Sequence, residues 1–335
     1  MAVPDYNFPI NNVLATTLDA QLPEIVDSIY GRIPLIQRLY QRFQNNERLP
    51  DGTDPIMYDG GDRIRATILY NKFVSDSYGK GQTFDTSFPE FLTQMIFEWK
   101  RVYAPINVDA LDLAKNAGSL VQVINFGEAL ARNGVMSLAD ELDNQIVAGD
   151  GTGNGGLDFD GLGNGVAATG TYGGITRNST VGDPGSTIKA NINSVGGPFS
   201  FSMLNDSMTQ VTFGKIKPDL ILTTVALWSK IWARSQVSER NTPGPMREVG
   251  FDTIKFNGAE VIADDYVPSG YIYLLNTSYI QLWLMKGYDF VRRGAKQGAQ
   301  GFPVYNQDAF VDQIICYGNL IVNGPRFQAR ISNVT

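Results

Sequence analysis

The chain has 335 residues, of which 43% are hydrophobic, so it can bury a sizeable core in one large or two intertwined domains. Its 34 acidic residues outnumber 27 Lys and Arg, and the net charge of -7 leaves no overall basic surplus for binding nucleic acid. Histidine is absent, which excludes histidine-based catalysis, histidine metal sites and a histidine pH switch.

The single cysteine and the short length of the apolar runs indicate the cellular compartment in which the protein is expected. Cys316 lies in an apolar run and is expected to be a small buried hydrophobic residue, and one cysteine excludes an intrachain disulfide. The N-terminus lacks a basic region followed by an apolar block, and no apolar run is long enough to span a bilayer. We therefore expect a protein that stays in a cytoplasm and contacts no membrane.

Residues 1–50 are expected to form an arm with an extended polar start and then a helix. Apolar residues at three-to-four spacing indicate the helix: Ile25, Ile29, Ile33, Ile36, Leu39, Tyr40 and Phe43. Gly31 and Pro34 interrupt this pattern, which favours a kinked helix or two short ones. The arginines that accompany it form either a solvated face or a weak phosphate-facing patch: Arg32, Arg38, Arg42 and Arg48.

Alternating polar and apolar residues predict two strands, over 63–74 and 95–99. The polar, turn-rich segment 75–82 lies between them, so the pair reads as a hairpin. An isolated hairpin is marginally stable, and the stripe of Met95, Phe97 and Trp99 is more than it can cover. We expect a neighbouring subunit to cover this stripe, with Trp99 as an anchor.

The longest helical signal runs over 108–148, where Gly127 and Gly134 are possible bends and Gly149 is placed to end the helix. Residues 149–200 are rich in Gly, Asn, Thr and Ser and are expected to be loops outside the core. A strand at 218–224, a helix at 225–234 and short strands near 253–256, 260–263, 271–275 and 280–284 follow. One or two long strands at 309–323 and a last strand at 325–331 complete an α+β arrangement.

No segment carries a convincing ligand motif. The glycine-rich stretch that starts at Asp150 resembles a calcium loop but has Thr152 at position three and Gly161 at position twelve, so an ordinary glycine turn is favoured. No glycine-rich turn has the residues that hold a nucleotide phosphate. A pair of catalytic carboxylates stays open, because the sequence alone cannot show two acids facing one cleft.

The order of arm, long hairpin, long helix, glycine-rich region, small α+β domain and closing strands resembles the major capsid proteins of tailed bacteriophages, which have the Hong Kong 97 type of fold. Local matches carry the resemblance. Residues 139–153 resemble the family's helix end that runs into a glycine loop, and residues 171–177 resemble the stretch that follows. Residues 218–232 and 256–276 resemble its axial-domain strands and helix.

The resemblance implies an α+β chain with four parts. These are an N-arm (1–50), an extended β-hairpin loop (51–107), a peripheral domain with a long spine helix (108–149 and 276–335), and an axial domain (150–275). Some members of this family begin with a scaffolding segment that is cleaved away. We expect none before the arm here, so that either scaffolding is a separate protein or the chain is already mature, and Met1 favours a separate protein.

The implied function is structural and not enzymatic, with no cofactor and no metal ion. Copies of the chain would assemble, as hexamers and pentamers, into the icosahedral head shell that encloses double-stranded DNA. Expected partners are these copies, a scaffolding protein, a portal, a decoration protein and nonspecifically held DNA. The location is the virion, after assembly in the host cytoplasm. Candidate intersubunit contacts are Lys80, Tyr78, Phe97, Trp99, Arg38 and Arg42.

Some relatives join a loop lysine to an asparagine of a neighbour, and Lys80 with Asn319 or Asn323 would be the pair here. That chemistry also needs a carboxylate in an apolar pocket, and the C-terminal strands contain only Asp308 and Asp312, so we expect no cross-link. Two alternative functions stay open. One is an encapsulin-like nanocompartment shell, and the other, from a different class, is an unrecognised carboxylate hydrolase.

Overall fold

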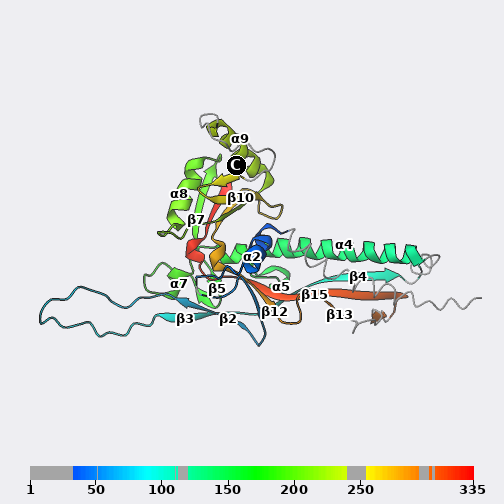
Figure 1. Cartoon of the computed structure of the whole chain (residues 1–335), viewed down its shortest axis with the longest axis horizontal. Coiled ribbons are helices and arrows are strands. Elements are labelled where there is room, and N and C mark those ends of the chain that lie inside the picture. Colours follow the sequence, from blue (N-terminus) through cyan, green and yellow to red (C-terminus); the bar gives the residue numbers. More distant parts are fainter. Residues whose placement is uncertain are drawn as a thin grey trace, which may run out of the picture.

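The computed structural model describes residues 33–50, 52–109, 111, 120–239, 254–293, 302–303 and 306–335. Within this part the chain forms two six-stranded sheets and two small hairpins, with helices packed on the sheets. Figure 1 shows an elongated lower body, a hairpin that projects from one end, and a smaller unit on top of the body. The expected α+β class is confirmed.

The lower sheet has the order β1-β12-β15-β13, and β4 and β14 also pair with β15. Its central strand is a single long one, in agreement with the strands expected over 309–323. The bounds are β1 Ile56–Asp59, β4 Lys100–Asp109, β12 Ile280–Met285, β13 Val291–Arg293, β14 Phe302–Pro303 and β15 Ala309–Val322.

Helix α4 (Leu120–Val147) lies along one face of this sheet (Figure 1). Strand β4 turns alternate residues to the helix, and the buried ones are Val102, Ala104, Ile106 and Val108. Gly134 lets the two elements approach closely, because a Cβ at this position would lie 3.0 Å from Ile106 Cγ1. The helix passes through Gly127 and Gly134, and Gly149 follows its end as expected.

The projecting hairpin consists of β2 (Ile64–Leu69) and β3 (Leu92–Phe97), which pair antiparallel and confirm the hairpin expected from the alternation. A second, smaller hairpin, β5 (Thr171–Tyr172) and β6 (Ile175–Thr176), packs against its base. Short helices flank β5 and β6: α5 Gly153–Gly156, α6 Leu162–Gly165 and α7 Pro184–Thr187.

The upper sheet has the order β7-β16-β11-β8-β10-β9. Strand β8 is buried at all four positions, as its unbroken apolar run predicts. The strands are β7 Asn191–Gly197, β8 Leu220–Thr223, β9 Ile254–Phe256, β10 Ala259–Ala263, β11 Ile272–Leu275 and β16 Ala329–Val334; the helices are α8 Phe201–Val211 and α9 Val225–Glu239. The strand and helix expected at 218–234 are confirmed.

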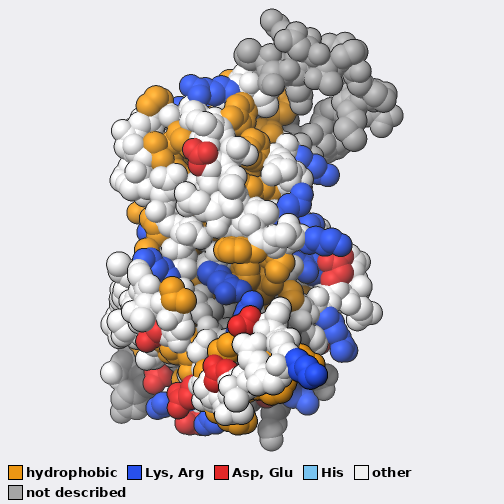
Figure 2. All heavy atoms as spheres, turned by 90° about the vertical axis from the view of Figure 1, so that its left-hand side faces the viewer, with side chains coloured by type: hydrophobic (Ala, Val, Ile, Leu, Met, Phe, Trp, Pro, Cys, Tyr) orange, Lys and Arg blue, Asp and Glu red, His pale blue; other side chains and the backbone are white. Residues whose placement is uncertain are grey.

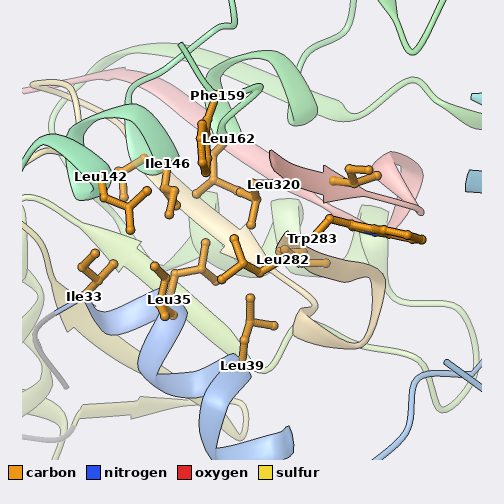
Figure 3. Close-up of a cluster of buried hydrophobic side chains, with 14 of the residues drawn as sticks. Ile33, Leu35, Leu39, Leu142, Ile146, Phe159, Leu162, Leu282, Trp283 and Leu320 are labelled. Atoms are coloured by element: carbon orange, nitrogen blue, oxygen red, sulfur yellow. The ribbon is translucent and has the colours of Figure 1, made fainter. Parts of the chain in front are cut away.

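The main core lies where the lower sheet, α4 and α2 (Pro34–Gln44) meet. Pro34 is the first residue of α2, so the expected break at this proline is confirmed, while residues 1–32 lie outside the described residues. Figure 3 shows the side chains that meet here: Ile33 just before α2, Leu35 and Leu39 from α2, Leu142 and Ile146 from α4, and Phe159, Leu162, Leu282, Trp283 and Leu320.

Three expectations need correction. Residues 100–109 form β4, so the long helix does not begin at 108, and its described part begins at Leu120. Residues 149–200 are not only surface loops, because Phe159 and Tyr172 are buried in the main core. The last strand is β16, and residues 325–327 before it form the 3-10 helix η2 (Pro325–Phe327).

The sheets also differ from the domain boundaries expected at 107 and 275. Strands β1 and β4 belong to the lower sheet, so the hairpin itself covers only residues 64–97 of the segment 51–107. Strand β16 pairs with β7 and β11 of the upper sheet, although it follows residue 275. The chain therefore crosses between the two sheets near its C-terminus.

Candidate assembly surfaces

The base of the hairpin is fixed to its own chain. Met95 is fully buried and Phe97 is 4% exposed, and the Phe97 ring meets that of Tyr172 edge-on with centroids 4.9 Å apart. The Ile96 N–H donates to the Gly173 carbonyl at 3.0 Å. The expectation that Met95 and Phe97 need a neighbour's cover is therefore wrong, because the β5–β6 hairpin of the same chain supplies it.

Two features of the β5–β6 turn make this contact specific. Gly173 has φ +56°, and a Cβ on it would lie 2.5 Å from Met95 Cβ, so only glycine allows this approach. The buried Tyr172 hydroxyl accepts a hydrogen bond from the Val322 N–H at 2.8 Å, and burial raises the pKa of this hydroxyl. The turn thus ties the hairpin to the central strand β15.

The Tyr70 N–H donates to the Phe91 carbonyl at 3.0 Å, and beyond this bond the far end of the hairpin, residues 71–90, has no strand pairing and is largely exposed. Tyr78 is 72% exposed and its ring lies 5.0 Å from that of Phe84, which is 67% exposed. Lys80 lies on the same exposed tip. Figure 2 looks onto this end of the molecule and shows exposed hydrophobic side chains among charges of both signs. Tyr78 and Lys80 therefore share one surface, apart from Phe97.

Trp99 lies between β3 and β4 and is half-buried against the main core. Its indole Nε1 donates to the Gly61 carbonyl at 3.0 Å. The residue is thus held by its own chain on one side and open on the other, so it does not continue the stripe of Met95 and Phe97.

Arg42 belongs to a network at the junction of the two sheets. Its Nη1 donates to Thr277 Oγ1 at 2.8 Å and to Ser278 Oγ at 2.9 Å, and Thr277 Oγ1 donates to Asp219 Oδ2 at 2.6 Å. Arg38 Nε lies 3.6 Å from the same Asp219 carboxylate. These contacts place Arg42 as a tie between α2 and the two sheets and leave little of it for a phosphate-facing patch.

Both asparagines considered for a cross-link form side-chain hydrogen bonds within the subunit. Asn319 is fully buried, and its Nδ2 donates to Asp160 Oδ2 at 2.9 Å and to the Glu98 carbonyl at 3.1 Å. Asn323 donates to Gln281 Oε1 at 2.7 Å. The absence of a cross-link stays a prediction, since the arrangement between subunits decides it.

The loop that starts at Asp150 is a tight glycine turn. Asp150 Oδ1 accepts from the Thr152 N–H at 2.9 Å and from the Thr152 hydroxyl at 2.7 Å, and these bonds lower the pKa of Asp150. Gly151 has φ +76°, and a Cβ on it would lie 2.3 Å from Asp160 Oδ1. Among the described residues no group of three or more acidic or cysteine side chains is placed to hold a metal ion.

On the face of the lower sheet opposite α4, the described residues leave a hollow. The exposed face of β4 carries Arg101 and Tyr103, and neighbouring strands add Arg293 and Tyr317. A groove of about 420 Å³ runs over this face, lined by Trp99, Lys100, Arg101, Val102, Tyr103, Asn154, Leu157, Arg293, Gln313, Ile315 and Tyr317. We call it the β4 groove.

Sequence reasoning missed both the β4 groove and the Gly173 contact. The sequence does contain a pattern that predicts one side of the groove. Polar and apolar residues alternate over 100–109, and this alternation places Arg101 and Tyr103 on one face of a strand. The Gly173 contact had none, since nothing local relates a glycine turn to a strand more than seventy residues earlier.

No protein-family model matches the sequence, and no curated protein matches it. Solved structures do. The cyanophage A-1(L) capsid asymmetric unit aligns with a TM-score of 0.61 at 12% identity, over 84% of this chain and 90% of that chain. The capsid of an empty GTA particle aligns with a TM-score of 0.57 at 8% identity, over 84% of this chain and 87% of that chain.

The SrpI encapsulin of Synechococcus elongatus PCC 7942 aligns with a TM-score of 0.51 at 14% identity, over 83% of this chain and 84% of that one. All three are chains of assembled shells or capsids, and each alignment spans most of both partners. Identities this low establish architecture alone. The chain therefore has the capsid-protein fold of the Hong Kong 97 type that the sequence resemblance predicts.

Proposed function

We propose that the chain is a major capsid protein that self-assembles into the icosahedral head shell around the double-stranded DNA of a tailed bacteriophage. The observation that carries this proposal is the structural match to the cyanophage capsid chain, which covers 84% of this chain. The exposed aromatic tip of the hairpin supports it, because a long projection with Phe88 91% exposed has little use in an isolated subunit.

In this function the parts of the fold take the roles that the resemblance implies. Residues 1–50 are the N-arm, the β2–β3 hairpin is the extended loop, α4 is the spine helix of the peripheral domain, and the upper sheet is the axial domain. Identical copies would form hexamers and pentamers, with a separate scaffolding protein, a portal and a decoration protein as further partners. Assembly takes place in the host cytoplasm and the product is the virion.

Electron microscopy of the purified protein under assembly conditions tests the proposal. We expect closed icosahedral particles. A chain that remains monomeric under all salt, pH and concentration conditions overturns it. The chain alone should also show no enzymatic turnover and no bound metal in elemental analysis of washed particles.

An encapsulin-like shell is the second candidate, and the alignment with the SrpI encapsulin favours it. The contents of particles isolated from the native source distinguish the two. Double-stranded DNA of uniform length supports the phage head, while a protein cargo without DNA supports the nanocompartment.

A carboxylate hydrolase is the candidate from a different class. Its expected sign is a pocket in which carboxylates with shifted pKa values converge, and the β4 groove has no acidic residue in its lining. Among the described residues, no helix is both long enough and apolar enough to cross a membrane.

The hairpin tip should serve assembly and not subunit folding. Residues 75–90 are almost all exposed, whereas the buried side chains of the hairpin lie on β2 and β3. Replacing 75–90 with a short Asn-Gly turn should therefore leave a soluble subunit that melts cooperatively but forms no closed shells. A shortened protein that unfolds, or one that still assembles normally, contradicts this role.

A further inference from the structure

The chain contains five pairs in which asparagine is followed by glycine. In such a pair the glycine nitrogen can attack the asparagine side chain and close an imide ring, because glycine has no Cβ to obstruct the attack. The reaction needs a glycine N–H that is not bonded elsewhere and space for the backbone to move. All five pairs lie within the described residues: Asn133–Gly134, Asn154–Gly155, Asn164–Gly165, Asn257–Gly258 and Asn323–Gly324.

Three of the pairs are held by the fold. Asn133–Gly134 lies within α4, where backbone N–H groups donate to carbonyls one turn earlier. Gly165 is buried, and its N–H donates to the Gly161 carbonyl at 2.9 Å. Gly324 is closely packed, because a Cβ on it would lie 2.8 Å from Phe327 Cδ2. We therefore expect the asparagines of these three pairs to persist in the folded protein.

The other two pairs lie in exposed turns of the same backbone conformation. Asn154 and Asn257 both have φ 50°, and the glycines that follow, Gly155 and Gly258, have φ 70° and 87°. Both residues of each pair are exposed. Asn257 and Gly258 form the two-residue turn between β9 and β10. The two turns thus present the same reacting groups in matched surroundings.

A lysine distinguishes the two exposed pairs. Lys217 Nζ donates to the Asn257 carbonyl oxygen at 3.0 Å, and this carbonyl belongs to the same peptide unit as the Gly258 N–H. When the nitrogen gives up its proton, negative charge spreads onto the carbonyl oxygen, where the ammonium stabilises it. At the other exposed pair, Lys100 Nζ donates to the Gly156 carbonyl, which lies outside the reacting peptide unit. Only the Asn257 turn therefore has a cation on the peptide unit that reacts.

We propose that Asn257–Gly258 is a self-modification site whose reaction Lys217 promotes. The Gly258 nitrogen loses its proton and attacks Asn257 Cγ, so that a nitrogen–carbon bond forms and the side-chain nitrogen leaves as ammonia with that proton. Water then adds to either carbonyl of the imide ring and breaks one of its carbon–nitrogen bonds, which leaves an aspartate or an isoaspartate. The new carboxylate forms beside the Lys217 ammonium, and their opposite charges favour the product. The reaction needs no second copy of the chain, so it is independent of the proposed function.

Peptide mapping by mass spectrometry tests the proposal. The folded full chain is incubated at mildly alkaline pH, and the conversion of each asparagine is followed over time. We expect Asn257 to convert faster than Asn154. Lys217→Met should slow Asn257 by about threefold to tenfold, a modest effect because the lysine is exposed, and should leave Asn154 unchanged. Lys217→Arg keeps a cationic donor and should retain most of the wild-type rate.

The chain unfolded in guanidinium chloride is the matched control, because unfolding removes both the packing of the held pairs and the position of Lys217. All five asparagines should then convert at similar rates, in the wild type and in Lys217→Met alike. Equal conversion of Asn257 in the folded wild type and the folded Lys217→Met variant overturns the inference. A faster conversion in the variant overturns it as well, since the lysine would then only hold the turn closed. An arginine variant that behaves like the methionine variant contradicts a role for the charge.

Discussion

Replacing Phe97 with alanine tests how the hairpin is held to the subunit. The side chain is 4% exposed and its ring lies 4.9 Å from that of Tyr172. Truncating a buried Phe to Ala costs about 3–5 kcal/mol, from lost transfer free energy and from the cavity that remains. We expect the upper half of this range, because the Val322 N–H holds the Tyr172 hydroxyl and so prevents the ring from moving into the space.

The assay is urea unfolding of the unassembled subunit, followed by fluorescence and far-UV circular dichroism. A matched control is Phe88→Ala, which makes the same chemical change at a side chain that is 91% exposed and should alter the free energy of unfolding by less than about 0.5 kcal/mol. The reasoning is refuted if Phe97→Ala costs less than about 1 kcal/mol, a loss below the range for a buried site. It is also refuted if the two variants behave alike.

Three other changes have defined outcomes under the same unfolding assay. Tyr172→Phe removes the acceptor of the buried Val322 N–H and should cost about 1–3 kcal/mol; no loss would show that this bond does not matter. Gly173→Ala should cost at least the roughly 1–2 kcal/mol of a left-handed backbone, and more from the clash with Met95; a neutral effect contradicts the close approach. Burial raises the pKa of Asp264, so the folded state binds its proton more tightly and the associated stability is lost as pH rises through that pKa. Asp264→Asn should therefore be more stable than the wild type at about pH 7, by a margin that shrinks toward about pH 4, and an equal margin at both contradicts the argument.

The sequence predicts strands well where one face is buried, because alternation then marks the buried positions. The β2–β3 pair and the long strand β15 show this. Strand β4 carries the same alternation over 100–109, but this stretch falls at the junction expected between the hairpin loop and the helix. Its four buried residues are the ones that α4 covers, a partner that the alternation cannot reveal.

The glycine-rich region shows where composition misleads. Glycine suggests loops, but here several glycines allow backbones to pack closely. A Cβ on Gly161 would lie 2.1 Å from the Gln145 carbonyl oxygen, and one on Gly165 would lie 2.5 Å from Val322 Cγ2. These contacts bring α6 onto α4 and β15, so Phe159 enters the main core. Close approach between distant segments leaves no local pattern in a sequence.

The candidate surface residues also divide into those whose surroundings the sequence predicts and those whose contacts it does not. Tyr78 and Lys80 lie in a polar, turn-rich segment, and their exposure follows from its composition. The bonds of Arg42 to Thr277 and Ser278 join residues more than two hundred positions apart, and nothing in the arm predicts them. Local composition therefore predicts which residues are exposed. Contacts between residues far apart in the sequence decide which charged side chains already have hydrogen-bond partners within the subunit.

The rigid base of the hairpin bears on how weak contacts at its tip could close a shell. Because the subunit core fixes β3 through Met95 and Phe97, the direction in which the hairpin leaves the body is set before any neighbour binds. A hairpin anchored at its base has less conformational freedom to lose on docking than a loop that is free at its base, so more of the contact energy would remain as affinity. Under the proposed function, modest contacts of this kind at many sites would hold a closed lattice together.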